Sequence, residues 1–248
     1  MRRRRFLGAL AALGAAPGFA SEHTVEAMRF SSLAPGAALP EWLRPYAFAN
    51  RPRLTEYSLV EDDRRTVLRA RADAATAGLI RRLRVDAGRY PIVGWRWKVT
   101  NLLAKSDLAT KEGDDYPVRL YVGFDVDPAT LPAAERFKLD LARLFWGEDL
   151  PLAALCYVWD ARAPAGTFAP NAYTDRVRMV VVESGAARLG RWVAYERDVA
   201  VDYRRAFGPS RPPVPAVNAI IVSTDTDNTG ERAEAFYGDV EFRSRRSS

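Results

Sequence analysis

The chain has 248 residues, enough for one large β-domain with a full hydrophobic core. Its only histidine, His23, lies near the amino end, which excludes a Ser-His-Asp triad, a Cys-His pair or a histidine-ligated zinc site unless that end folds back. The formal charge of +6 falls to +2 once the four arginines of residues 1–20 are set aside, so nucleic-acid binding is disfavoured.

Residues 1–20 have the pattern of an export signal. A basic head precedes an apolar run that is too short to cross a bilayer comfortably, and small residues follow near Ala20. Arg3 and Arg4, followed by Phe6 and Leu7, resemble the twin-arginine export pattern; an ordinary arginine-rich signal or a retained amphipathic anchor are the alternatives. We therefore expect residues 21–248 to form a periplasmic mature chain without a transmembrane segment.

Alternation of apolar and polar residues predicts a series of strands. The segments 54–60 and 66–72 flank a charged turn and are typical of a hairpin. A strand is expected at 77–85 and another at 92–99, where Trp95 and Trp97 share one face and Arg96 and Lys98 the other. The remaining predicted strands are 118–124, 152–159, 176–182, 192–199, 219–223 and 235–242. The single cysteine, Cys156, lies in one of these apolar runs, so we expect a core residue and not a nucleophile.

One long segment has helical periodicity instead. Apolar residues between 127 and 146 recur at steps of three and four, with Pro132 near the start, which predicts an inserted helix at about 130–146. Residues 21–248 contain no linker, internal repeat or low-complexity block, so a single domain is expected. About ten short strands joined by turns predict an all-β fold, an antiparallel two-sheet sandwich with a jelly roll as the expected topology.

Several ordered motifs resemble a known family. They are Trp95-Arg96-Trp97, Gly113-Asp114-Asp115 with Arg119, Tyr157-Val158-Trp159, Asn171, residues 202–208, residues 225–230 and Tyr237-Gly238-Asp239. Together, over residues 28–243, they resemble the bacterial domain-of-unknown-function 3047 family, a resemblance that implies no particular activity. The closing segment 235–242 is also similar, more weakly, to the last strand of galactose-binding-like and other carbohydrate-binding jelly rolls.

The turn after the segment 219–223 is dense in side-chain oxygens. Asp225, Asp227, Asn228 and Thr229 are candidate ligands for a hard cation, with Ca²⁺ as the candidate cofactor. The spacing superficially resembles a helix-flanked calcium loop, but Phe236 stands where that loop has its bidentate glutamate. The alternative is a turn in which these side chains cap backbone N–H groups.

A second polar cluster lies in the loop before the segment 118–124. Asp114 and Asp115 are adjacent carboxylates that repel unless a cation intervenes, and Arg119 could clamp them. A buried structural ion pair and a ligand site remain equally open interpretations. Trp159 and Asn171, from the shared motifs, complete the candidate ligand-binding set.

Aromatic residues are frequent enough to form either a core or a sugar-binding groove. Alternating strands place about half of such rings inside a sandwich, so we expect most of them in the core. The rings in question are Trp95, Trp97, Tyr157, Trp159, Phe168, Tyr173, Trp192 and Tyr203.

Three functional hypotheses follow. The first is a non-catalytic periplasmic binder of carbohydrate or another polar ligand. The second is a carboxylate-dependent glycan hydrolase or lyase that uses two of Asp114, Asp115, Asp225 and Asp227, which requires two carboxylates facing each other across an open cleft. The third is a structural or assembly factor of the envelope, marked by a broad apolar patch.

Overall fold

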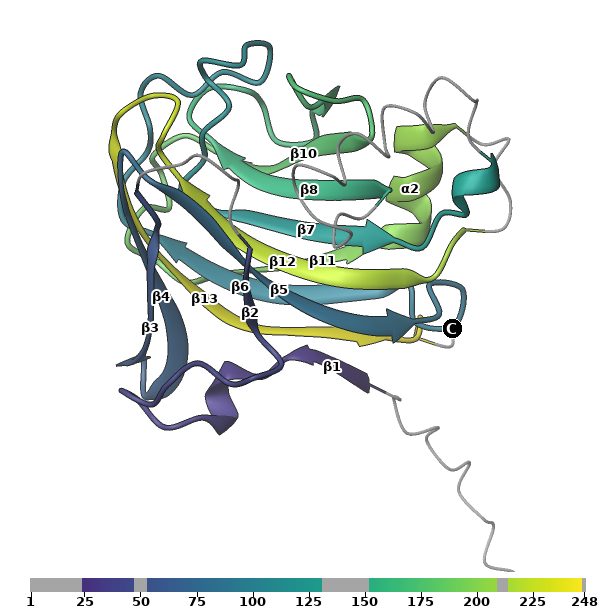
Figure 1. The fold of residues 1–248 in the computed structure, drawn as a ribbon, viewed down its shortest axis with the longest axis horizontal. Helices are drawn as coiled ribbons and strands as arrows, with labels where there is room; N and C mark the ends of the chain where they lie inside the picture. Colours follow the sequence, from purple (N-terminus) through teal and green to yellow (C-terminus); the bar gives the residue numbers. More distant parts are fainter. Residues whose placement is uncertain (1–23, 47–52, 131–151, 209–213, 247–248) are drawn as a thin grey trace, which may run out of the picture.

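Two β-sheets packed face to face make up most of the described chain, which comprises residues 24–46, 53–130, 152–208 and 214–246 of the computed structural model (Figure 1). The six-stranded sheet has the order β11-β6-β13-β4-β3, and β1 pairs with β13. Its strands are β1 (Thr24–Met28), β3 (Glu56–Asp62), β4 (Arg65–Asp73), β6 (Ile92–Val99), β11 (Val193–Asp198) and β13 (Arg232–Arg243).

The second sheet is seven-stranded, in the order β2-β5-β12-β7-β8-β10-β9. Its strands are β2 (Arg44–Tyr46), β5 (Thr76–Val85), β7 (Arg119–Phe124), β8 (Ala153–Asp160), β9 (Phe168–Pro170), β10 (Val177–Ser184) and β12 (Val217–Asp225). Short 3₁₀ turns occur at η1 (Phe30–Ser32) and η2 (Pro128–Thr130), and the α-helix α2 (Val199–Phe207) stands at the end of β7 and β8 (Figure 1). None of the described helices is long and apolar enough to cross a membrane.

The topology confirms the predicted all-β, two-sheet jelly-roll class. Successive strands alternate between the two sheets from β4 to β7 and again from β11 to β13, which wraps the chain around a single core. The predicted hairpin is β3–β4, whose two turn residues, Asp63 and Arg64, have positive φ as in a type I′ turn.

Two features differ from the prediction. The sheets are not wholly antiparallel, because β10 pairs with β8 in parallel. After β8 the chain first runs to the outer edge as β9 and then turns back, so that β10 fills the gap in the same direction as β8. The second difference is α2, which was not predicted. The helix predicted at about 130–146 lies outside the described residues beyond Thr130.

The main core lies between the sheets and takes most of the large rings, as predicted. Trp95, Trp97, Tyr157, Trp159 and Tyr203 are buried in it. A smaller core on the outer face of the seven-stranded sheet contains Tyr116, Cys156, Val158, Met179 and Val181. Because both faces of β8 are covered, all of its residues are buried. Burial raises the pKa of the Cys156 thiol to about 12, in agreement with a core role.

Candidate functional site

The two polar clusters expected from the sequence meet at one edge of the seven-stranded sheet. Strand β12 pairs antiparallel with β7, with Ser223 opposite Arg119, so the end of β12 and the start of β7 lie at the same edge. The loop before β7 and the loop after β12 therefore extend side by side. We call the residues that meet there, Asp114, Asp115, Arg119, Asn171, Asp225, Asp227 and Asn228, the loop site.

Arg119 is the centre of the loop site. Its side chain is 2% exposed, and its Nε and Nη2 atoms contact the two carboxylate oxygens of Asp225 at 2.8 and 2.6 Å. Its Nη1 donates to Asp114 Oδ1 at 3.0 Å, and its Nη2 also donates to the Asp114 carbonyl. The guanidinium lies over the Tyr116 ring, 4.6 Å from the ring centroid. One buried cation thus holds two carboxylates from loops more than 100 residues apart.

Asp115 connects the same two loops through neutral donors. Asn228 Nδ2 donates to Asp115 Oδ1 at 3.2 Å, and the backbone N–H of Thr229 donates to Oδ2 at 2.6 Å. Ser106 Oγ donates to the Asp115 carbonyl oxygen at 2.6 Å. Gly113 permits this packing, because a Cβ at that position would lie 2.6 Å from the backbone nitrogen of Asp107.

Asn171 and Tyr173 form the outer rim of the loop site. Asn171 Nδ2 donates to Asp114 Oδ2 at 2.9 Å, and its own Oδ1 accepts from the backbone N–H of Tyr173. The Tyr173 hydroxyl donates to Asn228 Oδ1 at 3.1 Å, while its side chain is about half exposed. Lys111 Nζ lies 5.3 Å from the centroid of this ring. Among the described residues, Tyr173 is the one aromatic residue with an exposed side chain.

Burial shapes the protonation of the loop site. It raises the pKa of Asp225 to about 7, although Arg119 acts in the opposite direction. Burial likewise raises the pKa of Asp115, against the hydrogen bonds from Thr229. For Arg119 burial acts to lower the pKa, but Asp114 and Asp225 outweigh it and raise the pKa well above the usual value. The site therefore holds a permanent cation and two carboxyl groups, Asp115 and Asp225, whose ionisation burial opposes.

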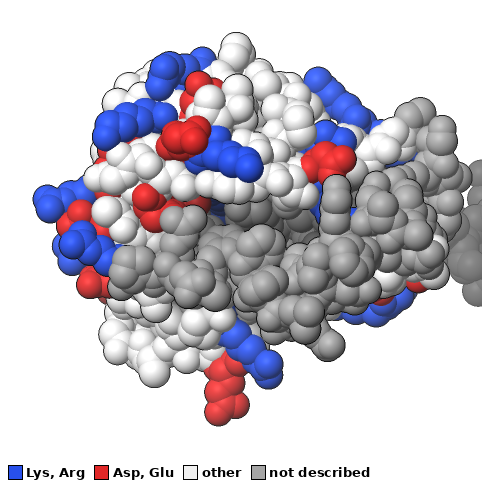
Figure 2. All heavy atoms as spheres, turned by 45° about the horizontal axis from the view of Figure 1, so that its top comes forward, with Lys and Arg blue, Asp and Glu red and all other residues white. Residues whose placement is uncertain are grey.

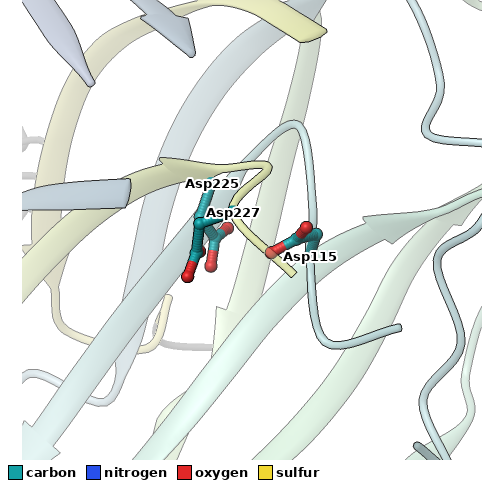
Figure 3. A group of neighbouring side chains, drawn as sticks. All are labelled: Asp115, Asp225 and Asp227. Carbon is teal, nitrogen blue, oxygen red and sulfur yellow. The ribbon is translucent and has the colours of Figure 1, made fainter. Parts of the chain in front are cut away.

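Three carboxylates of the loop site lie close enough together to hold a metal ion. Oxygen atoms of Asp115, Asp225 and Asp227 lie within 4.8 Å of one another, with Asp115 facing the other two from the neighbouring loop (Figure 3). The predicted metal set contained Asn228 and Thr229 in place of Asp115. Both residues instead donate hydrogen bonds to Asp115, so the third acidic group comes from the other cluster.

Trp159 does not join the loop site. Its side chain is fully buried in the main core, and its Nε1 donates to the carbonyl of Gly185, so it presents no ring face to a ligand. Lys105 was not among the predicted site residues, whereas Glu231 belongs to the oxygen-rich turn that follows β12. Lys105 Nζ donates to the Thr229 carbonyl, and the Glu231 carboxylate accepts from the backbone N–H groups of Ala104 and Lys105. These contacts hold the first part of the loop before β7 against the loop after β12.

Charged side chains of both signs are interspersed on the face of the molecule turned toward the viewer in Figure 2. No broad patch of one sign is visible there among the described residues. This distribution agrees with the small charge left once residues 1–20 are set aside.

Comparisons with known proteins give two similar solved structures and one family. The chain is similar to the family 11 carbohydrate-binding module of the cellulosomal cellulase Lic26A-Cel5E of Clostridium thermocellum, at 6% identity and a TM-score of 0.45, over 92% of this chain and 99% of that one. It is also similar to the Spr0440 glycoside hydrolase domain, Endo-D, of Streptococcus pneumoniae R6, at 10% identity and a TM-score of 0.32, over 84% of this chain and 22% of that one. The search of curated proteins found no match. A family model matches residues 40–241, so the chain belongs to the family described as "Protein of unknown function (DUF3047)", as its ordered motifs predicted.

Proposed function

We propose that this protein is a non-catalytic binder of carbohydrate or another polar ligand, and that the ligand binds at the rim of the loop site. The observation that carries the proposal is the position of Tyr173. Its side chain is half exposed, its hydroxyl donates to the amide oxygen of Asn228, and its backbone N–H donates to the amide oxygen of Asn171. Sugars are bound by a ring that packs against their C–H face and by amides and carboxylates that take their hydroxyl groups.

The contacts of the carboxylates support binding over catalysis. Glycoside cleavage by two carboxylates needs the two carboxyl groups to lie about 5–9.5 Å apart and to face each other across an open cleft. Asp114 and Asp225 are instead buried and clamped by the same guanidinium. With these two groups held by Arg119, the hydrolase or lyase hypothesis loses its best candidates. The network serves as a rigid base for the rim.

Binding of a panel of soluble glycans tests this proposal. We expect at least one neutral glycan to bind the wild-type protein, and Tyr173→Ala to weaken that binding about tenfold through loss of the ring contact. Tyr173→Phe is the matched control, since it keeps the ring and removes only the hydroxyl. Equal affinities of wild type and Tyr173→Ala would place binding elsewhere, and no binding of any glycan would favour the assembly-factor hypothesis.

We also propose Ca²⁺ as the cation for Asp115, Asp225 and Asp227. Arg119 is paired with Asp114 and Asp225, whereas Asp115 accepts hydrogen bonds from neutral donors, so the acidic groups of the site outnumber this one buried guanidinium. Added Ca²⁺ is expected to raise the melting temperature relative to EDTA. Because protons compete with the ion for Asp225, the increase should be larger at pH 8 than at pH 6. Asp227→Asn should abolish the increase; an identical increase in that variant would exclude the triad.

Export to the periplasm is proposed on the sequence of residues 1–20 alone. The basic head and apolar run support a signal, and adjacent Arg3 and Arg4 support the twin-arginine route. Replacement of Arg3 and Arg4 together by lysine should leave the protein in the cytoplasm of a bacterial host, as shown by cell fractionation. Normal export of that variant would favour an ordinary secretory signal.

A further inference from the structure

The seam between α2 and the outer strands β9 and β10 contains two arginines, each of which contacts an aromatic ring of the opposite element. Arg178 of β10 has its Cζ 5.7 Å from the centroid of the Phe207 ring in α2. Arg205 of α2 has its Cζ 3.9 Å from the centroid of the Phe168 ring in β9. We call these four residues the arginine seam.

The sheet register brings the two contacts together. Phe168 pairs with Val180, two positions along β10 from Arg178, so Phe168 and Arg178 project from the same face of the sheet. On α2, Arg205 and Phe207 both belong to the last turn. The same turn of the helix therefore makes both contacts with the sheet.

Neither arginine of the seam forms an ion pair within the part of the chain that the structure describes. Arg205 makes one long hydrogen bond, 3.4 Å, to the Gly166 carbonyl. The Nε of Arg178 is buried and has no acceptor. By contrast, the guanidinium groups of Arg119 and Arg197 are matched by carboxylates, Arg197 with both oxygens of Asp202. A buried donor without an acceptor is costly, so the arginine seam carries hydrogen-bonding capacity that the described residues leave unused.

A contact with an aromatic ring does not use the N–H donors of a guanidinium. A cation–π contact uses the flat face of the group, whereas its N–H donors project from the edge in the plane. Those edges match the two oxygens of a carboxylate, sulfate or phosphate in a bidentate arrangement. The rings also hold both guanidinium groups in place, which reduces the entropy lost when an anion binds.

We propose that the arginine seam is a binding site for an oxyanionic group, which is a carboxylate, a sulfate or a phosphate. The site is separate from the loop site. Asn171 directly follows β9, but its side chain contacts Met179 Sδ at 3.8 Å, and Met179 projects from the opposite face of β10 to Arg178. The oxyanion site therefore does not depend on the proposed carbohydrate binding at Tyr173.

Calorimetric titration of the purified protein with three polyanions tests the proposal. The probes are oligogalacturonate for carboxylate, dextran sulfate for sulfate and polyphosphate for phosphate, with neutral dextran as the control. At least one polyanion is expected to bind, with an affinity that falls as the salt concentration rises. The double variant Arg178→Gln plus Arg205→Gln should weaken this binding about tenfold or more, since each lost contact is a hydrogen bond between charged groups.

Matched variants separate the site from general charge and from folding. Arg65→Gln removes one exposed arginine at the start of β4, in the other sheet, and should leave affinity unchanged. Tyr173→Ala should also leave it unchanged. Because the two arginines pack α2 against the sheet, the melting temperature of each variant is measured as well. The double lysine variant keeps both charges without the planar edges, so it should fold and bind several-fold more weakly than wild type.

Two results would overturn the proposal. One is that none of the three polyanions binds the wild-type protein. The other is that a folded double variant, with either glutamine or lysine, binds polyanions as tightly as wild type does. The three probes also differ in the oxyanion they carry, so the pattern of binding identifies which chemical class the seam accepts.

Discussion

Arg119 is the residue through which most of the loop site is held in place. Its guanidinium is buried, contacts both oxygens of Asp225 and also neutralises Asp114. Removal of one member of a buried ion pair leaves the other charge in a low-dielectric setting without compensation. The stability of the whole loop cluster should therefore respond strongly to this side chain.

Arg119→Met is expected to lower the free energy of unfolding by about 3 kcal/mol or more, because Asp114 and Asp225 lose their buried cation. Urea unfolding measures the difference. Arg84→Met is the matched control, because Arg84 forms an exposed ion pair with Asp125 and its loss should cost under about 1 kcal/mol. Addition of Asp225→Asn to Arg119→Met should recover part of the loss. If Arg119→Met destabilised the protein no more than Arg84→Met does, the Arg119 network would contribute little to stability.

The convergence of the loop site was only partly predictable from single residues. Local composition singled out Asp114, Asp115 and Arg119 in one loop and Asp225 and its neighbours in another. That the two loops join depends on the pairing of β12 with β7, which places Ser223 opposite Arg119. Alternation along each strand carries no information on which strands pair, so Asp115 could not be assigned to the acidic triad from the sequence.

At the scale of elements, α2 begins at an N-cap residue, Asp198, that lies within the strand predicted over residues 192–199. Asp198 Oδ1 accepts hydrogen bonds from the backbone N–H groups of Ala200 and Val201, both at 3.0 Å, and Gly208 follows the helix with a positive φ. The β-branched Val199 and Val201 favoured an extension of the strand β11 instead. Asp198 before the helix and Arg204 and Arg205 in its last turn were the available signals.

Asp198→Ala should destabilise the protein by about 1 kcal/mol, the usual cost of a lost N-cap. Asp198→Asn separates the cap from the charge, since it keeps an oxygen for the two N–H groups and loses only the exposed ion pair with Arg245. We expect chemical denaturation to show a smaller loss for the asparagine variant. If both variants lose the same stability, the ion pair and not the cap supports α2.

The longer strands were predicted well for a clear physical reason. In β6 every second residue is buried, with Trp95 and Trp97 on the core side, and this period of two is visible in the sequence. Strands β2 and β9 have three residues each, which is too short to establish a period. The parallel pairing of β8 with β10 could not be predicted from the sequence either, because β8 is buried on both faces and its residues do not alternate between apolar and polar.

At the scale of the whole molecule, the buried carboxylates connect the loop site to the pH dependence of folding. Burial raises the pKa of Asp225 to about 7, whereas the unfolded chain has an ordinary aspartate pKa of about 3.9. At a pH between these two pKa values, Asp225 binds a proton in the folded state and releases it in the unfolded state. The contribution of Asp225 to stability is therefore fully present below about pH 4 and is lost as the pH rises through about 7. The raised pKa of Asp115 acts in the same direction.

Asp225→Asn should isolate this contribution, because asparagine does not titrate. The free energy of unfolding of wild type minus that of the variant is expected to decrease steadily as the pH is raised from 5 to 8. Subtraction of the two free energies of unfolding cancels most of the effect of the other titrating groups. One of these is Asp62, whose lowered pKa stabilises the folded state at neutral pH and no longer does so after acidification. Urea unfolding at several pH values, with EDTA present throughout, measures the trend. A difference that stays constant or grows with pH would show that Asp225 is ionised in the folded protein over this whole range, with the attraction of Arg119 outweighing the effect of burial.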